Sequence, residues 1–411
     1  MNPEPTHVMI IGAGPAGSAL ATLVARRGWS VVLVDRATFP RPKACGEFLS
    51  PGALAALGRL GLPLPGPEAG VLDRWTLTAD GRRVTATFGD ARGASLPRAQ
   101  LDAALVDEAR RSGVQVLEQS SYRHAARHTE TGAGPGIIEV RTPAGVRRFN
   151  PQLLVGAGGL HCPVSRRLGG TGPGRSAGKI SLTAHVSGIQ GPSRVGRLLV
   201  QGPLTVGLAP SDREGRWWNA TVVIPSGWAG RLSARGTRSF YLDCLAETGL
   251  GTTGLAMAEA TPLASSGFDR PSRRCFSHRT VLVGDAAGYF DPFTGQGIYQ
   301  ALRSSELLAP FLNLGLSGRT PWREALSRYA SALSRERTRT RRVQQAVEGW
   351  LGSGKLRPAL STGLSRAPTL FGAIMEATTD RSPLGAALRR SVGGARPPSD
   401  ATLRTDAPTP I

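Results

Sequence analysis

A glycine-rich turn near the N-terminus constrains the fold of this chain more than any other feature. Gly12-Ala13-Gly14-Pro15-Ala16-Gly17 follows an apolar run at residues 8–11 and precedes a helix-prone stretch that closes at Gly28. A second apolar run at residues 31–34 ends in Asp35. This order predicts a strand, a tight turn, a helix and a second strand, the unit that binds a dinucleotide pyrophosphate at the helix N-terminus.

The glycines and the acid of this unit have separate roles. Gly12 permits the tight turn, Gly14 lets the backbone approach a phosphate, and Gly17 lets the helix pack closely against the strand. Asp35 is expected to accept hydrogen bonds from ribose hydroxyls. Because a carboxylate there disfavours a 2′-phosphate, the pattern leaves NAD or FAD as the nucleotide.

A second glycine-rich segment lies far along the chain. The apolar run at residues 281–283 leads into Gly284-Asp285, and Gly295 and Gly297 precede another helix-prone stretch. At a strand end, Asp285 is expected to bond a ribose or ribityl hydroxyl. The backbone N–H groups near Gly295 and Gly297 predict an anion-binding nest. Two distant segments are therefore expected to hold one cofactor.

Four segments together resemble the para-hydroxybenzoate hydroxylase superfamily of flavoproteins, and within it the branch of geranylgeranyl reductases and flavin-dependent halogenases. They are residues 12–17, 40–47 (Pro-Arg-Pro-Lys-Ala-Cys-Gly-Glu), 98–102 (Arg-Ala-Gln-Leu-Asp) and 284–298. The likeness covers about residues 5–350 and implies FAD as the cofactor. It also implies that Arg98 reaches the phosphate or ribityl part of FAD and that Cys45 lies near the isoalloxazine, whereas Asp102 is expected to be structural.

The pattern and the resemblance together give a set of expected cofactor contacts. These are Gly12, Gly14, Ala16, Gly17, Asp35, Arg36, Cys45, Arg98, Gly284, Asp285, Gly295, Gln296, Gly297 and Ile298. No catalytic residue is assigned, and the candidates for positions beside the flavin are Cys45, Pro292 and Phe293. No metal site is expected, because the four cysteines and six histidines lack metal-ligand spacing.

One segment departs from the superfamily pattern. Where a Gly-Ala-Asp-Gly-x-x-Ser context is usual, this chain has Gly156-Ala157-Gly158-Gly159-Leu160-His161-Cys162. Since that segment is thought to help engage the cofactor and NAD(P)H, the sequence does not decide between NADH and NADPH as the reductant.

The predicted fold is α/β: a Rossmann-like FAD-binding domain of three-layer ββα type, an inserted β-rich substrate domain, and C-terminal helices. The FAD-binding domain is expected at residues 1–72, 99–176 and 276–350, and its last part includes helices. The substrate domain is expected at residues 73–98 and 177–275, where short alternating segments suggest strands. A helical region at 351–391 and a disordered tail at 392–411 complete the prediction.

The formal net charge of +21 is carried almost entirely by arginine. The densest run, Arg335–Arg342, is expected to be a solvated helix face, with attraction to an anionic membrane surface as the alternative. Nucleic acid is not an expected partner, since no aromatic residues interleave with the arginines. No apolar run approaches the roughly 18 residues of a membrane span. The expected location is cytoplasmic, with peripheral membrane association left open.

The expected activity is a monooxygenase that uses NAD(P)H and O2 to hydroxylate or epoxidise a hydrophobic aromatic, polyketide, quinone or quinolone substrate in secondary metabolism. The first alternative is reduction of a prenyl or other C=C bond, as in geranylgeranyl reductases, although their aromatic-x-Trp-x-Phe-Pro segment is missing. The second is a flavin-binding partner protein without turnover. A halogenase is disfavoured because those enzymes need a lysine between the flavin and the substrate, and residues 44–178, where it would fall, contain no lysine. Residues expected to line an apolar pocket are Trp217, Trp218, Phe240, Phe290 and Phe293.

Overall fold

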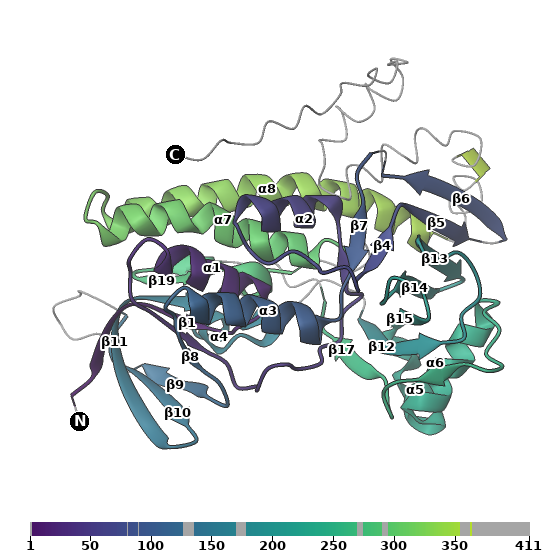
Figure 1. Cartoon of the computed structure of the whole chain (residues 1–411), viewed down its shortest axis with the longest axis horizontal. Coiled ribbons are helices and arrows are strands. Elements are labelled where there is room, and N and C mark those ends of the chain that lie inside the picture. Colours follow the sequence, from purple (N-terminus) through teal and green to yellow (C-terminus); the bar gives the residue numbers. More distant parts are fainter. Residues whose placement is uncertain are drawn as a thin grey trace, which may run out of the picture.

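Two large sheets with helices packed on them form the molecule (Figure 1). The computed structural model describes residues 2–79, 81–88, 90–125, 135–169, 178–268, 274–289, 295–353 and 362–363. The predicted mixed α/β fold with a Rossmann-like part is confirmed. The predicted C-terminal helical region and tail lie almost wholly outside the described residues.

The first sheet carries the predicted nucleotide unit at its centre. Its strand order is β18-β19-β11-β1-β2-β8, and β10 and β9 extend it from β11. The strands are β1 (Glu4–Ile11), β2 (Val31–Val34), β8 (Gln115–Leu117), β9 (Ser121–Ala125), β10 (Ile138–Thr142), β11 (Gly145–Gly156), β18 (Phe276–Ser277) and β19 (Thr280–Leu282). Strands β19, β11, β1, β2 and β8 are parallel, so their carboxyl ends meet at one edge.

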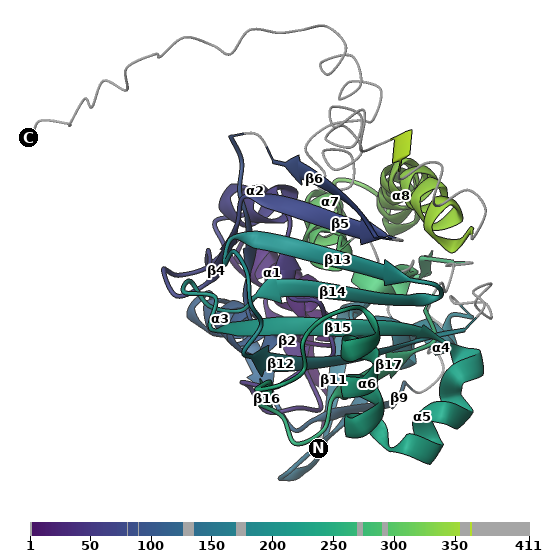
Figure 2. The same cartoon turned by 90° about the vertical axis from the view of Figure 1, so that its right-hand side faces the viewer.

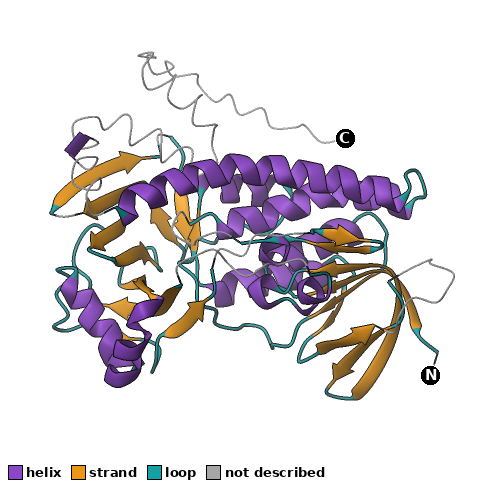
Figure 3. Ribbon diagram, turned by 180° about the vertical axis from the view of Figure 1, so that it is seen from behind, coloured by secondary structure: helices purple, strands orange, loops and turns teal. Residues whose placement is uncertain are grey.

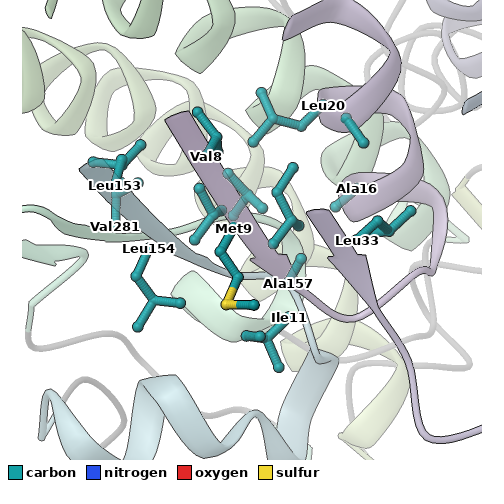
Figure 4. Close-up of a cluster of buried hydrophobic side chains, with 14 of the residues drawn as sticks. Val8, Met9, Ile11, Ala16, Leu20, Leu33, Leu153, Leu154, Ala157 and Val281 are labelled. Atoms are coloured by element: carbon teal, nitrogen blue, oxygen red, sulfur yellow. The ribbon is translucent and has the colours of Figure 1, made fainter. Parts of the chain in front are cut away.

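The centre of this sheet is apolar on both faces. Val8, Met9 and Ile10 of β1 are fully buried, as are Leu33 and Val155 on the two neighbouring strands. Figure 4 shows part of this cluster, with side chains from β1, β2, β11 and β19 meeting Ala16 and Leu20 of the first helix. Continuous apolar runs are typical of parallel strands covered on both sides.

Four helices belong to this half of the molecule. They are α1 (Pro15–Ala25), α3 (Arg98–Arg111), α7 (Gly297–Leu316) and α8 (Trp322–Gly352). Helix α1 packs against both α3 and α7, and α8 packs against α7. Figure 3 shows the two long helices α7 and α8 from behind, running along the molecule from the first sheet to the second. No described helix has the length and apolar character needed to span a bilayer.

The second sheet forms the other half. Its order is β16-β12-β15-β14-β13-β5-β6, with β17 paired to β12. The strands are β5 (Arg74–Ala79), β6 (Arg82–Thr87), β12 (Lys179–Ser187), β13 (Val195–Gln201), β14 (Leu204–Pro210), β15 (Trp217–Pro225), β16 (Ala256–Met257) and β17 (Leu263–Ser266). Helices α5 (Ala229–Arg235) and α6 (Thr237–Glu247) lie over its outer face (Figure 2). The short strands predicted within residues 73–98 are present as the antiparallel pair β5 and β6.

The remaining described elements are short. They are β3 (Phe48–Leu49), α2 (Pro51–Arg59), β4 (Gly70–Leu72), β7 (Gly93–Ser95), α4 (Pro163–Arg167), and the 3-10 turns η1 (Gly159–His161), η2 (Ser226–Trp228) and η3 (Gly284–Ala287). The Ser50 hydroxyl caps helix α2, because it accepts a hydrogen bond of 3.1 Å from the backbone N–H of Ala53.

Candidate cofactor and substrate site

A cavity of about 1020 Å³ is lined by residues from both sheets. On one side it meets the carboxyl ends of β1, β2, β11 and β19, where open α/β sheets bind their ligands. On the other side it meets the inner face of the second sheet. Its volume is at the upper end of the range for small-molecule sites.

The N-terminus of α1 forms one end of this cavity. Gly12, Gly14, Pro15 and Ala16 line it, and no side chain among the described residues caps the helix. The first turn of α1 also contains no acidic residue. Because the first N–H groups of a helix carry partial positive charge, this end is suited to a phosphate.

Two glycines let the turn before α1 pack closely against the neighbouring backbone at this end of the cavity. A Cβ on Gly12 would lie 2.6 Å from the carbonyl carbon and oxygen of Ala157, which directly follows the neighbouring strand β11. A Cβ on Gly17 would overlap the carbonyl oxygen of Gly12. Gly17 does not itself line the cavity, so its predicted place in the site is as a packing residue of the turn.

Asp35 is held at the end of β2 by backbone donors. Its Oδ2 accepts a hydrogen bond of 2.8 Å from the N–H of Ala13, and its Oδ1 accepts one of 2.9 Å from the N–H of Ala37. A carboxylate has about four acceptor positions, so capacity remains for ribose hydroxyls. Arg36 and Tyr122 line the cavity beside it.

Arg98 faces the same helix N-terminus from α3. Its Nη2 lies 3.9 Å from the position of a Cβ on Gly14. Its Nε and Nη2 donate to the two carboxylate oxygens of Asp102 at 2.8 and 2.7 Å. Although burial opposes the charge, Asp102 raises the pKa of Arg98. Asp102 thus has a structural role, because it holds the guanidinium of Arg98 in place.

Lys43 is a functional candidate that the sequence reasoning missed. Its side chain is exposed to the cavity, near Gly159 and Asp285. Burial within the surrounding protein and the charge of Arg98 lower the pKa of Lys43, while Asp285 opposes this shift. The sequence did offer one signal for Lys43, because Lys43 belongs to the same Pro-Arg-Pro-Lys-Ala-Cys segment as Cys45.

Asp285 lies where the sequence predicts, just after β19 and on the cavity wall. Burial raises the pKa of its carboxyl, and the cations Lys43, Arg98 and Arg337 act against that shift. The charges facing this part of the cavity are mainly positive. They match a cofactor that brings two phosphate charges, so the donor set fits FAD.

Arg337 supports the turn that carries Asp285. From α8 it donates through Nη2 to the carbonyl oxygen of Gly284 at 3.0 Å and through Nη1 to that of Ala287. The prediction that residues 335–342 form a solvated face is therefore wrong at Arg337, although Arg335 and Arg342 are exposed. Burial lowers the pKa of Arg337.

Replacing Arg337 with methionine is expected to weaken FAD binding about tenfold and to destabilise the protein by about 2 kcal/mol, because two charge-assisted hydrogen bonds to the η3 turn are lost. Flavin fluorescence titration and thermal unfolding measure the two effects. Arg335→Met, on an exposed site of the same helix, is the control and should leave both unchanged. An Arg337→Met protein with wild-type affinity would exclude this support role.

The Cys45–Glu47 turn enters the cavity wall from the other side. Cys45 Sγ accepts a hydrogen bond of 3.3 Å from the N–H of Glu47, and the Cys45 carbonyl oxygen accepts one of 2.9 Å from Nδ2 of Asn219 on β15. The wall also contains Gly295, Gly297 and Ile298, whereas the neighbouring Gln296 is 3% exposed and not part of it. Pro292 and Phe293 lie outside the described residues.

The segment of residues 156–162, which departs from the superfamily pattern, also borders the cavity. Gly158, Gly159, Leu160 and His161 line it. A Cβ on Gly158 would lie 3.3 Å from Cα and 3.4 Å from Sγ of the buried Cys162. The two substitutions in this segment are therefore adjacent in space, and the exchange of aspartate for glycine leaves room for the cysteine.

The substrate end of the cavity is aromatic and uncharged. Its aromatic residues are Phe48, Trp75, Phe268, Tyr289 and Trp350. The second sheet contributes hydroxyl, glycine and aliphatic side chains such as Thr205, Gly207, Thr221 and Val223, and no described lining residue from its strands is charged. The expectation of an apolar pocket thus rests on different residues from those predicted.

Three of the predicted pocket aromatics lie elsewhere. Trp218 and Phe240 are buried between the outer face of the second sheet and α6, and Trp217 is 36% exposed. Side chains alternate between the two faces of a strand, so Trp218 points away from the cavity that Thr221 and Val223 line. Phe290 and Phe293 lie outside the described residues.

Comparisons with known proteins agree with this geometry. Residues 5–348 match the family model described as FAD binding domain. Menaquinone reductase from Mycobacterium tuberculosis is 27% identical over 337 residues, which cover 75% of this chain and 77% of that protein. The motif-based resemblance is confirmed.

Solved structures with the same fold carry a range of descriptions, and two of them follow. A geranylgeranyl bacteriochlorophyll reductase-like protein from Thermoplasma acidophilum has a TM-score of 0.76 and 17% identity, covering 96% of this chain and 98% of that chain. PqsL from Pseudomonas aeruginosa, in complex with 2-aminobenzoylacetate, has a TM-score of 0.65 and 22% identity, covering 92% and 100%.

Proposed function

The chain belongs to the FAD binding domain family and is a flavin-dependent oxidoreductase, and from this premise we propose that it is a monooxygenase of a neutral, ring-bearing hydrophobic substrate. One observation carries the proposal: the aromatic, uncharged substrate end of the cavity. Flat apolar rings pack well against Phe48, Trp75 and Trp350, whereas an anionic substrate would find no cation among the described lining residues of the second sheet's strands.

Each part of the cavity wall has a role in this proposal. The α1 N-terminus, Arg98 and Lys43 would hold the pyrophosphate and ribityl part of FAD, and Asp35 and Asp285 would accept from its hydroxyls. Bound FAD supplies the electron transfer and the oxygen activation. The inner face of the second sheet orients the substrate, and Trp350 and Val347 at the end of α8 close off water.

Reduction of a C=C bond is the second candidate, and two observations favour it. The Cys45 thiol lines the cavity within the turn expected beside the flavin. The curated relatives described as menaquinone reductase and digeranylgeranylglycerophospholipid reductase are both 27% identical to this chain. Against these stands PqsL, which is described as 'a probable FAD-dependent monooxygenase' and shares the fold.

Isotope incorporation distinguishes the candidates. The FAD-loaded protein is supplied with NADH or NADPH, ¹⁸O2, and a panel of alkylated phenols, quinones and prenyl lipids. Oxygenation consumes one O2 and one NAD(P)H, places one ¹⁸O atom in the product and releases the other as water. A product that gains two hydrogens on the carbons of a C=C bond under anaerobic conditions establishes C=C reduction instead. Flavin reduction with no substrate-dependent reoxidation would leave a passive binder and overturn both candidates.

A further inference from the structure

A chain of acid, imidazole and acid joins the Cys45–Glu47 turn to the second sheet. His185 lies on β12, with Nε2 2.7 Å from Oε2 of Glu47 and Nδ1 2.6 Å from Oε1 of Glu259. The backbone N–H of His185 donates to the other oxygen of Glu259 at 2.8 Å. Glu47 is 3% exposed and lines the cavity. The side chain of Glu259 is 22% exposed, so this row of three side chains runs from the cavity wall towards the surface.

The geometry favours a charged imidazole. A neutral histidine has one N–H and donates to one partner, whereas both ring nitrogens of His185 face carboxylate oxygens. Two ionised glutamates are satisfied together when the ring is an imidazolium. Burial opposes the charge, but Glu47 and Glu259 outweigh it and raise the pKa of His185 to about 9.

The other groups around Glu47, His185 and Glu259 do not compete for the proton on the His185 ring. Tyr241 on α6 interacts with Glu259, and burial with that carboxylate raises the pKa of the Tyr241 hydroxyl well above its usual range. Arg238, also on α6, donates to the backbone carbonyl of Glu259 at 3.3 Å. From α3, the backbone N–H of Arg98 donates to Oε1 of Glu47 at 2.8 Å.

The turn that His185 contacts has an unusual backbone conformation. Glu47 has φ +56°, a left-handed value that residues other than glycine rarely adopt. Such conformations persist where the surroundings hold them. Here the carboxylate of Glu47 is held by His185, and the Cys45 carbonyl is held by Asn219, which is paired with His185 in the β12–β15 ladder. Two neighbouring residues of the second sheet thus fix both ends of the turn.

We propose that His185, as an imidazolium between Glu47 and Glu259, is a positioning residue for the cofactor, because it holds the Cys45–Glu47 turn in the shape that FAD binds. The proposal rests on membership of the FAD-binding family and is independent of the choice between oxygenation and reduction. It implies that FAD affinity depends on one proton in the second sheet.

The direction of the pH effect on FAD affinity follows from the raised pKa of His185. The pKa of His185 in the folded protein, about 9, is above the value of roughly 6.5 for an unfolded histidine. The stabilisation is therefore complete below about pH 6.5 and is lost as the pH rises through about 9. FAD affinity should fall over the upper part of this range.

The test measures the FAD dissociation constant of the full chain from pH 7 to 10 by flavin fluorescence. The wild-type constant should rise about tenfold, the effect of losing one charge-assisted hydrogen bond. His185→Gln should bind weakly at every pH, and its curve also corrects for the ionisation of free FAD. Glu259→Gln should shift the midpoint to lower pH. His7→Gln, which removes a histidine near the start of β1, is the control and should follow the wild type.

Histidine NMR on ¹³C-labelled wild-type protein tests the proton directly. The resonance that disappears in His185→Gln should titrate near pH 9, and in Glu259→Gln it should titrate lower. A His185 that titrates near pH 6.5 in the folded protein would overturn the proposal. So would wild-type affinity and pH dependence in His185→Gln. Should that variant not fold, the pH series and the spectra of the wild type and Glu259→Gln decide. These readouts need no turnover, so they are separate from the test of the proposed activity.

Discussion

Replacing Gly17 with alanine is expected to weaken FAD binding by about 100-fold or more, measured by flavin fluorescence titration of the purified protein. A Cβ at this position overlaps the carbonyl oxygen of Gly12 and lies 3.2 Å from the Cβ of Ala157. The obstacle is backbone, so no side-chain rotation relieves it. The α1 N-terminus must move away from the turn, and the phosphate-facing N–H groups move with it.

A matched control is available in another helix. Gly58 lies in α2, is exposed, and a Cβ there meets nothing within 4 Å. Gly58→Ala is therefore expected to leave FAD affinity unchanged and to raise the free energy of unfolding by roughly 0.4–1 kcal/mol, because alanine has fewer unfolded conformations. Equal affinity in Gly17→Ala and Gly58→Ala would show that the close approach of α1 is not needed for binding.

The sequence predicted which segments meet at one edge of the first sheet because its signals there are local. The turn at Gly12–Gly17, the acid Asp35 and the turn at Gly284–Asp285 each follow a strand by a fixed number of residues. In a parallel sheet the carboxyl ends of neighbouring strands share one edge, so strand identity alone brings these segments together. Each of them lies at the carboxyl edge of the first sheet.

The substrate end was less predictable because it depends on strand facing and on contacts between distant segments. Trp218 and Thr221 both belong to β15, yet one is buried under α6 and the other lines the cavity. A single-residue ambiguity in the strand pattern exchanges the two faces. Trp350, which does line the cavity, comes from the end of α8, in a segment that was predicted only to include helices.

Charge gave the least information about individual residues. Arg335 and Arg337 are both in one arginine-rich run, but only Arg337 reaches the η3 turn. His185 was one of six dispersed histidines, and its partners Glu47 and Glu259 are far from it in the sequence. Such pairings follow from the packing of the two sheets, which a local pattern does not encode.

Replacing Asp102 with alanine is expected to destabilise the protein by about 3–5 kcal/mol, measured by urea unfolding, and to weaken FAD binding as well. Its carboxylate is fully buried and bonds the Arg98 guanidinium through two hydrogen bonds of 2.8 and 2.7 Å. Arg41 lies 3.3 Å from the same carboxylate. Removing the acid leaves the buried guanidinium of Arg98 without its counter-charge.

A double variant separates stability from cofactor binding. Arg98→Met with Asp102→Leu replaces the buried ion pair by apolar groups, a change that is often neutral for stability. The unfolding free energy should therefore recover relative to Asp102→Ala. FAD affinity should stay at least about tenfold below wild type, because the cation that faces Gly14 and the α1 N-terminus is gone. Recovery of both properties would mean that Arg98 serves packing alone, and that the helix N-terminus and Lys43 suffice to hold the phosphates.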